Sequence, residues 1–382
     1  MSIQETISNK RGRASFSLRL RNRLNLEWQK VSRFVISANP KVYYPYCDLL
    51  HTHPSFFRYY ERPPLPYSNL FNAELCHWIS YIKEKGRGIP YVIEPQDHPL
   101  SPAEKSEPGE VLAGIQRVLD TYMDTKCRKI LIESEGQRNL FNRYLPDQVL
   151  EKTEIIRAGA IVQPVDLGKK FSGVETPVFV CFASDYKKKA VDILIKAWLG
   201  FDSKTKCRLI LACPNVPSEI SDSLAKENIH IISKAPLSSS DKRKLLNSAH
   251  VMLAPLHVDG GANVIEAFEY GLPVITMRSQ RSFIRDGNGW EVDVPFYFYD
   301  EGYGKEWPTW ERFWQLLDDA KKKNDFDITV QGFVNIFEEI ANSPEKLLDK
   351  GKAAYNVASG EFSLETRNAT LRRIYSESIR DR

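Results

Sequence analysis

Three polar loops in the second half of the chain contain residue types that bind phosphate and sugar hydroxyl groups. The first loop reads Ser-Asp-Tyr-Lys-Lys-Lys over 184–189, between an apolar stretch and a helical one. Lysine ammonium groups beside a helix start can hold a diphosphate by charge, while backbone N–H groups donate hydrogen bonds. Ser184, Lys188 and Lys189 are therefore candidate donor-binding residues, and a solvated lysine run is the alternative.

The second loop, Lys-Ala-Pro-Leu-Ser over 234–238, follows an expected strand at 229–232. Pro236 and Leu237 can flank a flat nucleobase and leave its edge to the peptide groups. A simple connection between a strand and a helix is the alternative.

The third loop, His-Val-Asp-Gly-Gly-Ala-Asn over 257–263, precedes a helix that contains Glu266. Two glycines let the backbone approach a ligand, and the N–H groups of a helix start are free to bind phosphate or sugar oxygens. We place Glu266 in the first helical turn, where it can accept hydrogen bonds from a ribose hydroxyl pair. The residues expected to cradle sugar or phosphate are Asp259, Gly260, Gly261, Ala262 and Asn263, and Asp259 is also a catalytic candidate.

Histidines supply a second type of candidate. His98, next to Asp97, follows an expected strand at 89–94, and the pair could act as a base or orient a substrate. His51 and His53 are two residues apart, but no third ligand is spaced beside them, so we expect strand-end polar residues and no metal site.

The elements that must position these loops alternate between strand and helix. Expected strands lie at 177–183, 208–212, 229–232, 251–254 and 273–276, and expected helices lie at 190–198, 218–227, 240–248 and 263–270. This alternation predicts an α/β fold with a parallel sheet covered on both faces. In such sheets ligands bind beyond the carboxyl ends of the strands, which is where the three loops fall.

Before this region, strands are expected at 48–53, 89–94, 129–132 and 154–158, and helices at 108–123 and 134–144, followed by a polar linker at 166–175. After it, the expected helices are 307–322, 330–342, 343–358 and 364–378. In the third of these, Ser343 is the expected cap and Pro344 the first helical residue.

Length and composition indicate two globular domains. The chain has 382 residues, 42% hydrophobic and 27% charged, and its apolar runs are far shorter than the roughly 20 residues that span a bilayer. The N-terminus lacks the apolar core of a secretory signal, so a cytoplasmic location is expected. Six cysteines without CxxC spacing indicate neither a zinc site nor a disulfide framework.

Basic residues are concentrated at the N-terminus. Residues 1–34 have an excess of six positive charges, whereas the whole chain has a net charge of +4. Such an arm suggests an anionic surface, lipid or nucleic acid. We expect peripheral contact with the inner face of a membrane and no nucleic acid; a solvated tail is the alternative.

A family resemblance adds to these observations. The run 249–276, with its strand, small-residue loop, Glu-Ala helix and Gly-Leu-Pro-Val-Ile strand, resembles the donor half of retaining GT-B glycosyltransferases of family four. Lys-x-Val-Asp-x-Leu-Ile-x-Ala over 189–197, the turn at 284–289 and Phe362-Ser363 before a closing helix support it. The resemblance covers roughly 178–375, and the upstream strands match the acceptor domain more weakly.

The resemblance implies GT-B architecture: two Rossmann-like parallel-sheet domains facing a cleft, the first of them abbreviated. The implied parts are the basic arm at 1–34, an acceptor-side domain at 35–165, a nucleotide-sugar-binding domain at 175–360 and a closing helix at 361–382. The implied reaction is metal-independent transfer of a sugar, with retention, from a UDP-, GDP- or ADP-sugar to an unknown polysaccharide, lipid or protein glycan. No cofactor is implied.

By position in the family motifs, Lys189 matches the phosphate-binding lysine, Glu266 matches the second glutamate of Glu-x7-Glu, and His98 lies where an acceptor-domain histidine reaches the sugar. The chain departs from the pattern in three ways. Val258 replaces the first glutamate, Ser184 replaces an arginine, and the glycine-rich loop of the first domain is missing, since no glycine lies between Gly12 and Gly86. A non-catalytic GT-B scaffold and a nucleotide-sugar epimerase are the alternatives.

Overall fold

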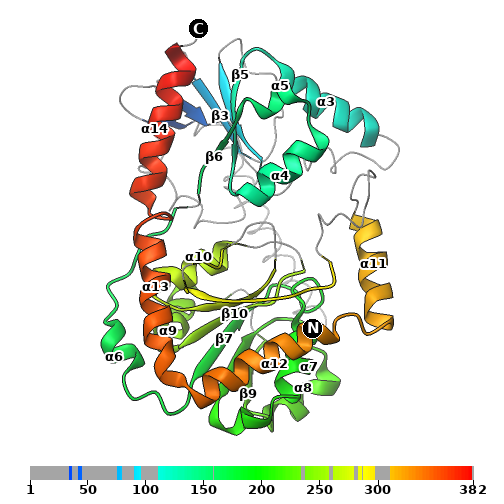
Figure 1. Cartoon of the computed structure of the whole chain (residues 1–382), viewed down its shortest axis with the longest axis vertical. Helices are drawn as coiled ribbons and strands as arrows, with labels where there is room; N and C mark the ends of the chain where they lie inside the picture. The colour runs from blue at the N-terminus through cyan, green and yellow to red at the C-terminus, as the bar shows by residue number, and fades with distance from the viewer. Residues whose placement is uncertain are drawn as a thin grey trace, which may run out of the picture. The chain divides into compact units, whose positions relative to one another are not determined.

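A computed structural model of the chain places two compact units (Figure 1). The structure describes residues 34–36, 42–44, 75–79, 90–95, 111–157, 159–233, 237–257, 261–278, 283–285, 287–296 and 310–380. Unit 1 comprises Met1–Ile132, Tyr144–Ile156 and Asn368–Arg382, and unit 2 comprises Glu133–Arg143 and Arg157–Arg367. The long C-terminal helix therefore contributes most of its length to unit 1.

Unit 1 contains a six-stranded sheet in sequential order. Its strands are β1 (Phe34–Ile36), β2 (Val42–Tyr44), β3 (Leu75–Ile79), β4 (Tyr91–Glu94), β5 (Cys127–Ile132) and β6 (Thr153–Ile155). β1 and β2 pair antiparallel, and the pairings from β2 through β6 are parallel. The predicted strands that became β4, β5 and β6 are confirmed, whereas the strand expected at 48–53 lies outside the described residues.

The helices of unit 1 include α3 (Val111–Met123), α5 (Asp147–Leu150) and most of α14 (Leu364–Arg380). Tyr375 of α14 is buried against β3, and its hydroxyl lies 2.7 Å from Nδ1 of His77. Nε2 of the same ring lies 3.3 Å from a carboxylate oxygen of Glu94 on β4. A buried polar chain thus joins the C-terminal helix to two neighbouring strands, and the paired groups offset each other's loss of hydration.

Unit 2 contains a second six-stranded sheet, in which every neighbouring pair of strands is parallel. The strands are β7 (Val178–Phe182), β8 (Arg208–Ala212), β9 (Ile229–Ile232), β10 (Val251–Ala254), β11 (Val274–Met277) and β12 (Gly289–Val292). Their order is β12-β11-β10-β7-β8-β9. The strand order reverses between β7 and β10, so the fold is doubly wound and its switch point lies there.

Both faces of the unit 2 sheet are covered, as the alternating sequence predicts. The side chain of Phe179 packs against Trp198 of α7 and Phe337 of α12, with ring centroids 5.5 and 5.4 Å apart. Its neighbour Val180 is buried on the opposite face, in a cluster that includes Phe268. Because successive strand residues point to opposite faces, this apolar run is buried on both sides.

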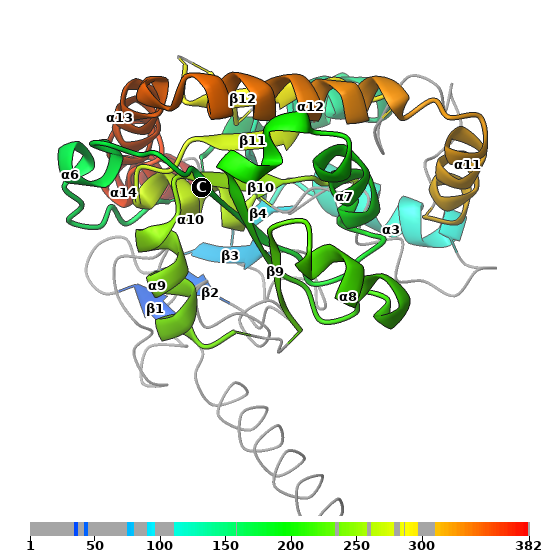
Figure 2. The same cartoon turned by 90° about the horizontal axis from the view of Figure 1, so that it is seen from below.

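Unit 2 contains several helices. They are α4 (Glu135–Tyr144), α6 (Leu167–Phe171), α7 (Val191–Leu199), α8 (Ser218–Ala225), α9 (Ser239–Ser248), α10 (Ala262–Glu269), α11 (Trp310–Lys322), α12 (Asp327–Asn342) and α13 (Leu347–Ser359). Of these, α7, α9, α10, α12 and α13 are visible around its sheet in Figures 1 and 2. Except at α6, helices were predicted at these places and are confirmed, with boundaries shifted by a few residues. Among the described residues, no helix is both long and apolar enough to cross a membrane.

Two local predictions were wrong. The linker expected at 166–175 contains α6, because the Asp166 side chain caps it by accepting a hydrogen bond from Lys169 N at 3.0 Å. Pro344 is the first helical residue, as predicted, but of a short 3₁₀ turn that leads into α13, and Ser343 at the cap position makes no side-chain bond.

Candidate functional site

The switch point brings the loop after β7 and the helix after β10 to the same edge of the unit 2 sheet. The side chain of Asn263, in the first turn of α10, donates to the carbonyl oxygen of Phe182 at 3.3 Å. Phe182 is the last residue of β7. This bond fixes the start of α10 against the carboxyl end of the central strand, where doubly wound folds bind ligands.

A lysine that no motif marked completes this arrangement. Lys242 of α9 forms an ion pair with Glu266 and donates to Oδ1 of Asn263 at 2.9 Å. Its ammonium also lies 5.1 Å from the ring centre of Phe182. The side chains of Lys242 and Glu266 are only 23% and 19% exposed, so their attraction is less screened than that of a surface pair.

The sequence places Lys242 there through the cap of its helix. Ser238 caps α9 by accepting from Asp241 N at 3.0 Å, which sets the register of the following residue. At the other ends of the two helices, the ammonium of Lys170 donates to the carbonyls of Leu246 and Tyr270 at 2.9 and 3.2 Å. Burial lowers the pKa of Lys170 to about 7. One side chain therefore joins the carboxyl-terminal ends of α9 and α10.

Glu266 was predicted to lie in the first turn of α10, and this prediction was wrong. The helix begins at Ala262, so Glu266 is its fifth residue and lies one turn further in. The residue is one position too late for direct contact with the N–H groups of the helix start. The carboxylate is balanced by Lys242 instead of by the helix dipole.

The lysine loop 184–189 leads from β7 to α7 with Ser184 and Lys188 exposed and Lys189 half-buried. The N–H groups of residues 187–191 are already bonded within the loop, and phosphate binding by the loop backbone stays a prediction. Asp185 accepts from Lys187 N and Lys188 N at its side chain, and from Lys189 N at its carbonyl. Ala190 N and Val191 N bond to the carbonyls of residues 187 and 186.

The start of α10 differs in this respect. The first hydrogen bond of this helix runs from Ile265 N to the carbonyl of Gly261, which is buried. The N–H groups of residues 262–264 precede this first bond and therefore have no acceptor within the helix. Ala262 and Asn263 thus occupy the helix start that was predicted to bind sugar or phosphate, while Leu237, partly buried, immediately precedes the cap of α9.

Several predicted residues lie outside the described residues: Asp97, His98, Pro236, Asp259 and Gly260, together with His51 and His53. Their roles remain predictions from the sequence. Among the described residues, no group of three or more His, Cys, Asp or Glu side chains is placed to hold a metal ion.

His257 follows β10 and is 7% exposed, with its ring 5.3 Å from that of Phe326. Burial, and secondarily the positive charge of Lys321, lowers the pKa of His257 to about 3. Lys321 is itself paired with Asp192 of α7 at 2.6 Å. The imidazole is therefore neutral at physiological pH.

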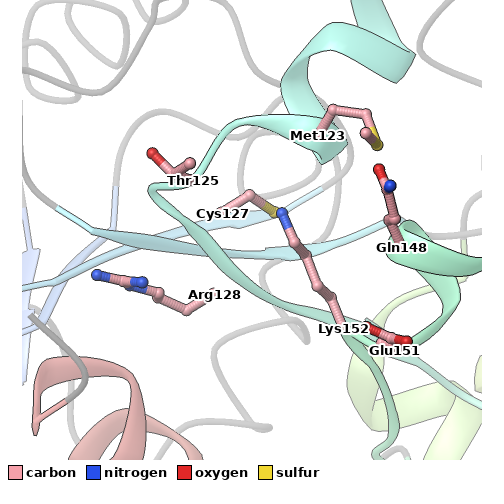
Figure 3. A pocket seen from close by; sticks show the side chains of 7 residues that line it. All are labelled: Met123, Thr125, Cys127, Arg128, Gln148, Glu151 and Lys152. Carbon is pink, nitrogen blue, oxygen red and sulfur yellow. The ribbon is translucent and has the colours of Figure 1, made fainter.

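A surface pocket is present in unit 1 (Figure 3). It lies at the amino ends of strands, whereas the site in unit 2 lies at the carboxyl ends. It includes Cys127, the first residue of β5, and Lys152, whose ammonium donates to the carbonyls of Tyr122 and Asp124 at 2.8 and 2.9 Å. The pocket thus lies at the amino end of a parallel strand, not at the carboxyl end where ligands bind. Burial raises the pKa of Cys127 to about 12, so this thiol is not a nucleophile.

Comparisons with known proteins concern the fold of the chain and the segment that contains the unit 2 site. Residues 176–295 match the family model described as glycosyl transferases group 1. No curated protein sequence matches the chain.

Solved structures with the same fold are similar over most of the chain. Sucrose-phosphate synthase from Thermosynechococcus elongatus is 15% identical, with a TM-score of 0.56 over 88% of this chain and 81% of that one. Alr3699/HepE from Anabaena, crystallised in complex with UDP, is 15% identical, with a TM-score of 0.53 over 80% and 79%. A glycosyltransferase from Rickettsia africae is 11% identical, with a TM-score of 0.54 over 82% and 78%. The chain therefore has the GT-B fold, and residues 176–295 of its second unit are similar to the glycosyl transferases group 1 family model.

Proposed function

We propose that the protein is a glycosyltransferase that binds a nucleotide diphosphate sugar at the switch point of unit 2 and transfers the sugar to a glycan or lipid-linked acceptor. The observation that carries the proposal is the convergence of Lys242, Asn263 and Glu266 at the carboxyl end of β7. The match of 176–295 to glycosyl transferases group 1 supports it, as does the binding of UDP by the Anabaena protein.

Glu266 is the proposed ribose-binding residue. Its carboxylate forms an ion pair with Lys242, and its oxygens are the proposed acceptors for a hydroxyl pair. Asn263 lies beside this ion pair: its side chain accepts a hydrogen bond from Lys242 and donates one to the carbonyl oxygen of Phe182. Lys242 is thus a positioning residue for the two side chains that were predicted from the sequence.

The diphosphate is proposed to lie between the start of α10 and the lysine loop. The N–H groups of residues 262–264 supply hydrogen bonds and the positive end of the helix dipole. Lys188 and Lys189 supply charge from the side chain, because the amides beside them are already used. The two positions together would stabilise the negative charge that develops on the leaving group.

In the proposed transfer, the bond between the anomeric carbon and the β-phosphate oxygen breaks and a bond to the acceptor oxygen forms. The acceptor proton passes to the departing phosphate, so no protein base is required for retention. Asp97 and His98 are the proposed acceptor-side residues, and Asp259 the proposed carboxylate near the sugar. The protein is proposed to act as a cytoplasmic enzyme without metal or cofactor, with the basic arm 1–34 at the inner membrane face.

The test is a transfer and hydrolysis assay with UDP-, GDP- and ADP-sugars, with and without a mixture of glycan and lipid-linked acceptors. The proposal expects turnover of at least one sugar nucleotide, which Glu266→Gln lowers by about tenfold or more, the scale expected when a hydrogen bond to a charged group is lost. Lys352→Ala, on the exposed side of α13, should leave turnover unchanged.

Val258, at the place of the family's first glutamate, favours one competing function, a non-catalytic scaffold. Nucleotide binding without turnover of any sugar nucleotide would favour that scaffold and contradict the transferase. Conversion of the donor sugar without any acceptor would indicate an epimerase.

A further inference from the structure

The lysine loop contains its own hydrogen-bond system, centred on Asp185. One carboxylate oxygen accepts from Lys187 N at 3.0 Å and from Lys188 N at 2.8 Å. These bonds, first of all the one from Lys188, hold the pKa of Asp185 below its usual value. A carboxylate therefore stays charged in the middle of the loop whose lysines are proposed to bind an anion.

Asn215 ties this loop to the neighbouring strand. It follows β8, which pairs directly with β7, so the two loops emerge side by side at the carboxyl edge. The side-chain oxygen of Asn215 accepts from Tyr186 N at 3.0 Å, and its amide nitrogen donates to the other oxygen of Asp185 at 3.4 Å. The two side chains are complementary, because the Asn215 amide supplies the donor that the Asp185 carboxylate lacks.

The consequence is that, from residue 186 onward, the backbone N–H groups of the loop are hydrogen-bonded before any ligand arrives. Each amide from Tyr186 through Val191 donates either to Asp185, to Asn215 or to a loop carbonyl. A backbone fixed in this way sets the starting direction of each lysine side chain, and a preorganised site loses less entropy on binding.

We propose that Asp185 and Asn215 are positioning residues for diphosphate binding by Lys188 and Lys189. This proposal rests on the proposed function. It assigns Asp185 a geometric role that outweighs its charge, since the charge alone opposes an anionic ligand.

The two roles of Asp185 make opposite predictions. In Asp185→Asn, one negative charge is removed, but the amide of residue 185 then faces the amide of Asn215, donor against donor. In Asn215→Asp, two carboxylates face each other. In the exchanged variant Asp185→Asn/Asn215→Asp, the donor and acceptor are restored with the total charge unchanged, so the pair can re-form.

The experiment measures binding of UDP, GDP, ADP and inorganic pyrophosphate to the full chain by calorimetry, with uridine, guanosine and adenosine as phosphate-free probes. We expect each single variant to bind the diphosphates about three- to tenfold more weakly, the size of one lost hydrogen bond, and the exchanged variant to recover to within about twofold. Nucleoside binding should be unchanged in all variants, which a general loss of structure would not allow.

Tighter diphosphate binding by Asp185→Asn would overturn the proposal, because charge would then be the deciding effect. An exchanged variant as weak as Asn215→Asp would overturn it as well. Wild-type affinity in all the variants would reject the positioning role alone and leave nucleotide binding in place. Absence of binding of every diphosphate probe to the wild type would reject the proposed function together with this extension.

Discussion

At the residue scale, the pair Lys242 and Glu266 behaves as one unit, because each balances the charge of the other in a partly buried place. Lys242→Met and Glu266→Gln should each lower nucleotide affinity by about tenfold, the value expected for one charge-assisted hydrogen bond. The double variant should be little worse than either single one, since both substitutions break the same interaction. Titration calorimetry of the three variants checks this, and fully additive losses would show that the two residues act separately.

His257 is the residue through which acid should act on stability. Its pKa is about 3 in the folded protein and about 6.5 when unfolded, so the unfolded chain binds a proton that the folded one does not. The contribution to stability is complete above pH 6.5 and is lost as the pH falls toward 3, by at most about 1.4 kcal/mol per pH unit. His250, whose pKa burial lowers to about 4, adds to the same slope.

Urea unfolding between pH 8 and pH 4.5 measures this effect. His257→Leu should show a shallower decline than the wild type, with similar stability at pH 8. An identical slope in the two proteins would mean that His257 is accessible to protons in the folded state.

Some residues of this site could be predicted from the sequence, because polar residues next to glycines and a helix start are a recognisable pattern for ligand binding. Asn263, Glu266 and the lysines stand out beside glycines and a helix start, and the structure places Asn263 and Glu266 together. Lys242 could not be predicted, because a lysine on an exposed-looking helix is ordinary and its 24-residue separation from Glu266 carries no periodic signal. The use of the loop amides also required the structure, since it depends on Asn215, which belongs to another strand's loop.

At the element scale, the turn between α10 and β11 depends on Gly271. This residue has a φ of +63°, and a Cβ added there would lie 2.4 Å from Cδ2 of Leu167 on α6. Gly271→Ala therefore combines backbone strain with a steric clash, and should lower the unfolding free energy by about 2–4 kcal/mol.

Gly287 offers a matched control for this prediction. It also has a positive φ, +77°, but among the described residues no atom beyond its chain neighbours lies within 4 Å of an added Cβ. Gly287→Ala should therefore show the strain alone, about 1 kcal/mol. Thermal and urea unfolding of both variants test the comparison, and equal losses would mean that α6 moves aside at no cost.

Element types and order were predictable where the hydrophobic pattern is regular. The parallel strands β7 to β11 are continuous apolar runs separated by amphipathic helices, so their pattern directly indicates a doubly wound sheet. β12 and β3 were missed because each is short and mixes apolar with polar or glycine residues, and only pairing with a neighbouring strand makes them strands. α6 was missed because five residues give no helical period.

At the scale of the whole molecule, the chain crosses between the two units after Ile132, Arg143, Ile156 and Arg367. The unit 2 segments beside the last two crossings are far apart in the sequence but meet in space. Within unit 2, these two segments lie side by side, since Ala160 pairs with Ser363 and Leu364 N donates to the carbonyl of Ala160 at 3.0 Å. Glu361 joins them further by accepting from Arg157 at 2.8 Å and from Arg285 at 2.9 Å. Both passages are thereby held to one unit.

The ion pairs of Glu361 with Arg157 and Arg285 form a clamp between the two segments, and Glu361→Gln should weaken it. The carboxylate is 37% exposed, so screening keeps the expected loss small, about 1 kcal/mol or a few degrees in melting temperature. Glu365→Gln, in the first turn of α14, is the control. Limited proteolysis should detect faster cleavage near 157–160 in Glu361→Gln alone, and equal cleavage rates in the two variants would contradict the clamp.

Chain length predicted two units, and the resemblance to glycosyltransferases predicted their common fold. The exact points where the chain crosses between units were not predictable, because they depend on contacts between segments 200 residues apart, such as Arg157 with Glu361. The proposed function of the whole molecule depends on one claim, that unit 2 binds a nucleotide.

Calorimetric titration of the full chain with UDP, GDP and ADP tests that claim most directly, in the wild type, Lys189→Ala and the surface control Lys352→Ala. We expect the wild type and the control to bind one of these nucleotides with equal affinity, and Lys189→Ala to bind it about tenfold more weakly. Absence of binding of all three nucleotides to the wild type, or equal affinity of the wild type and Lys189→Ala, would contradict it.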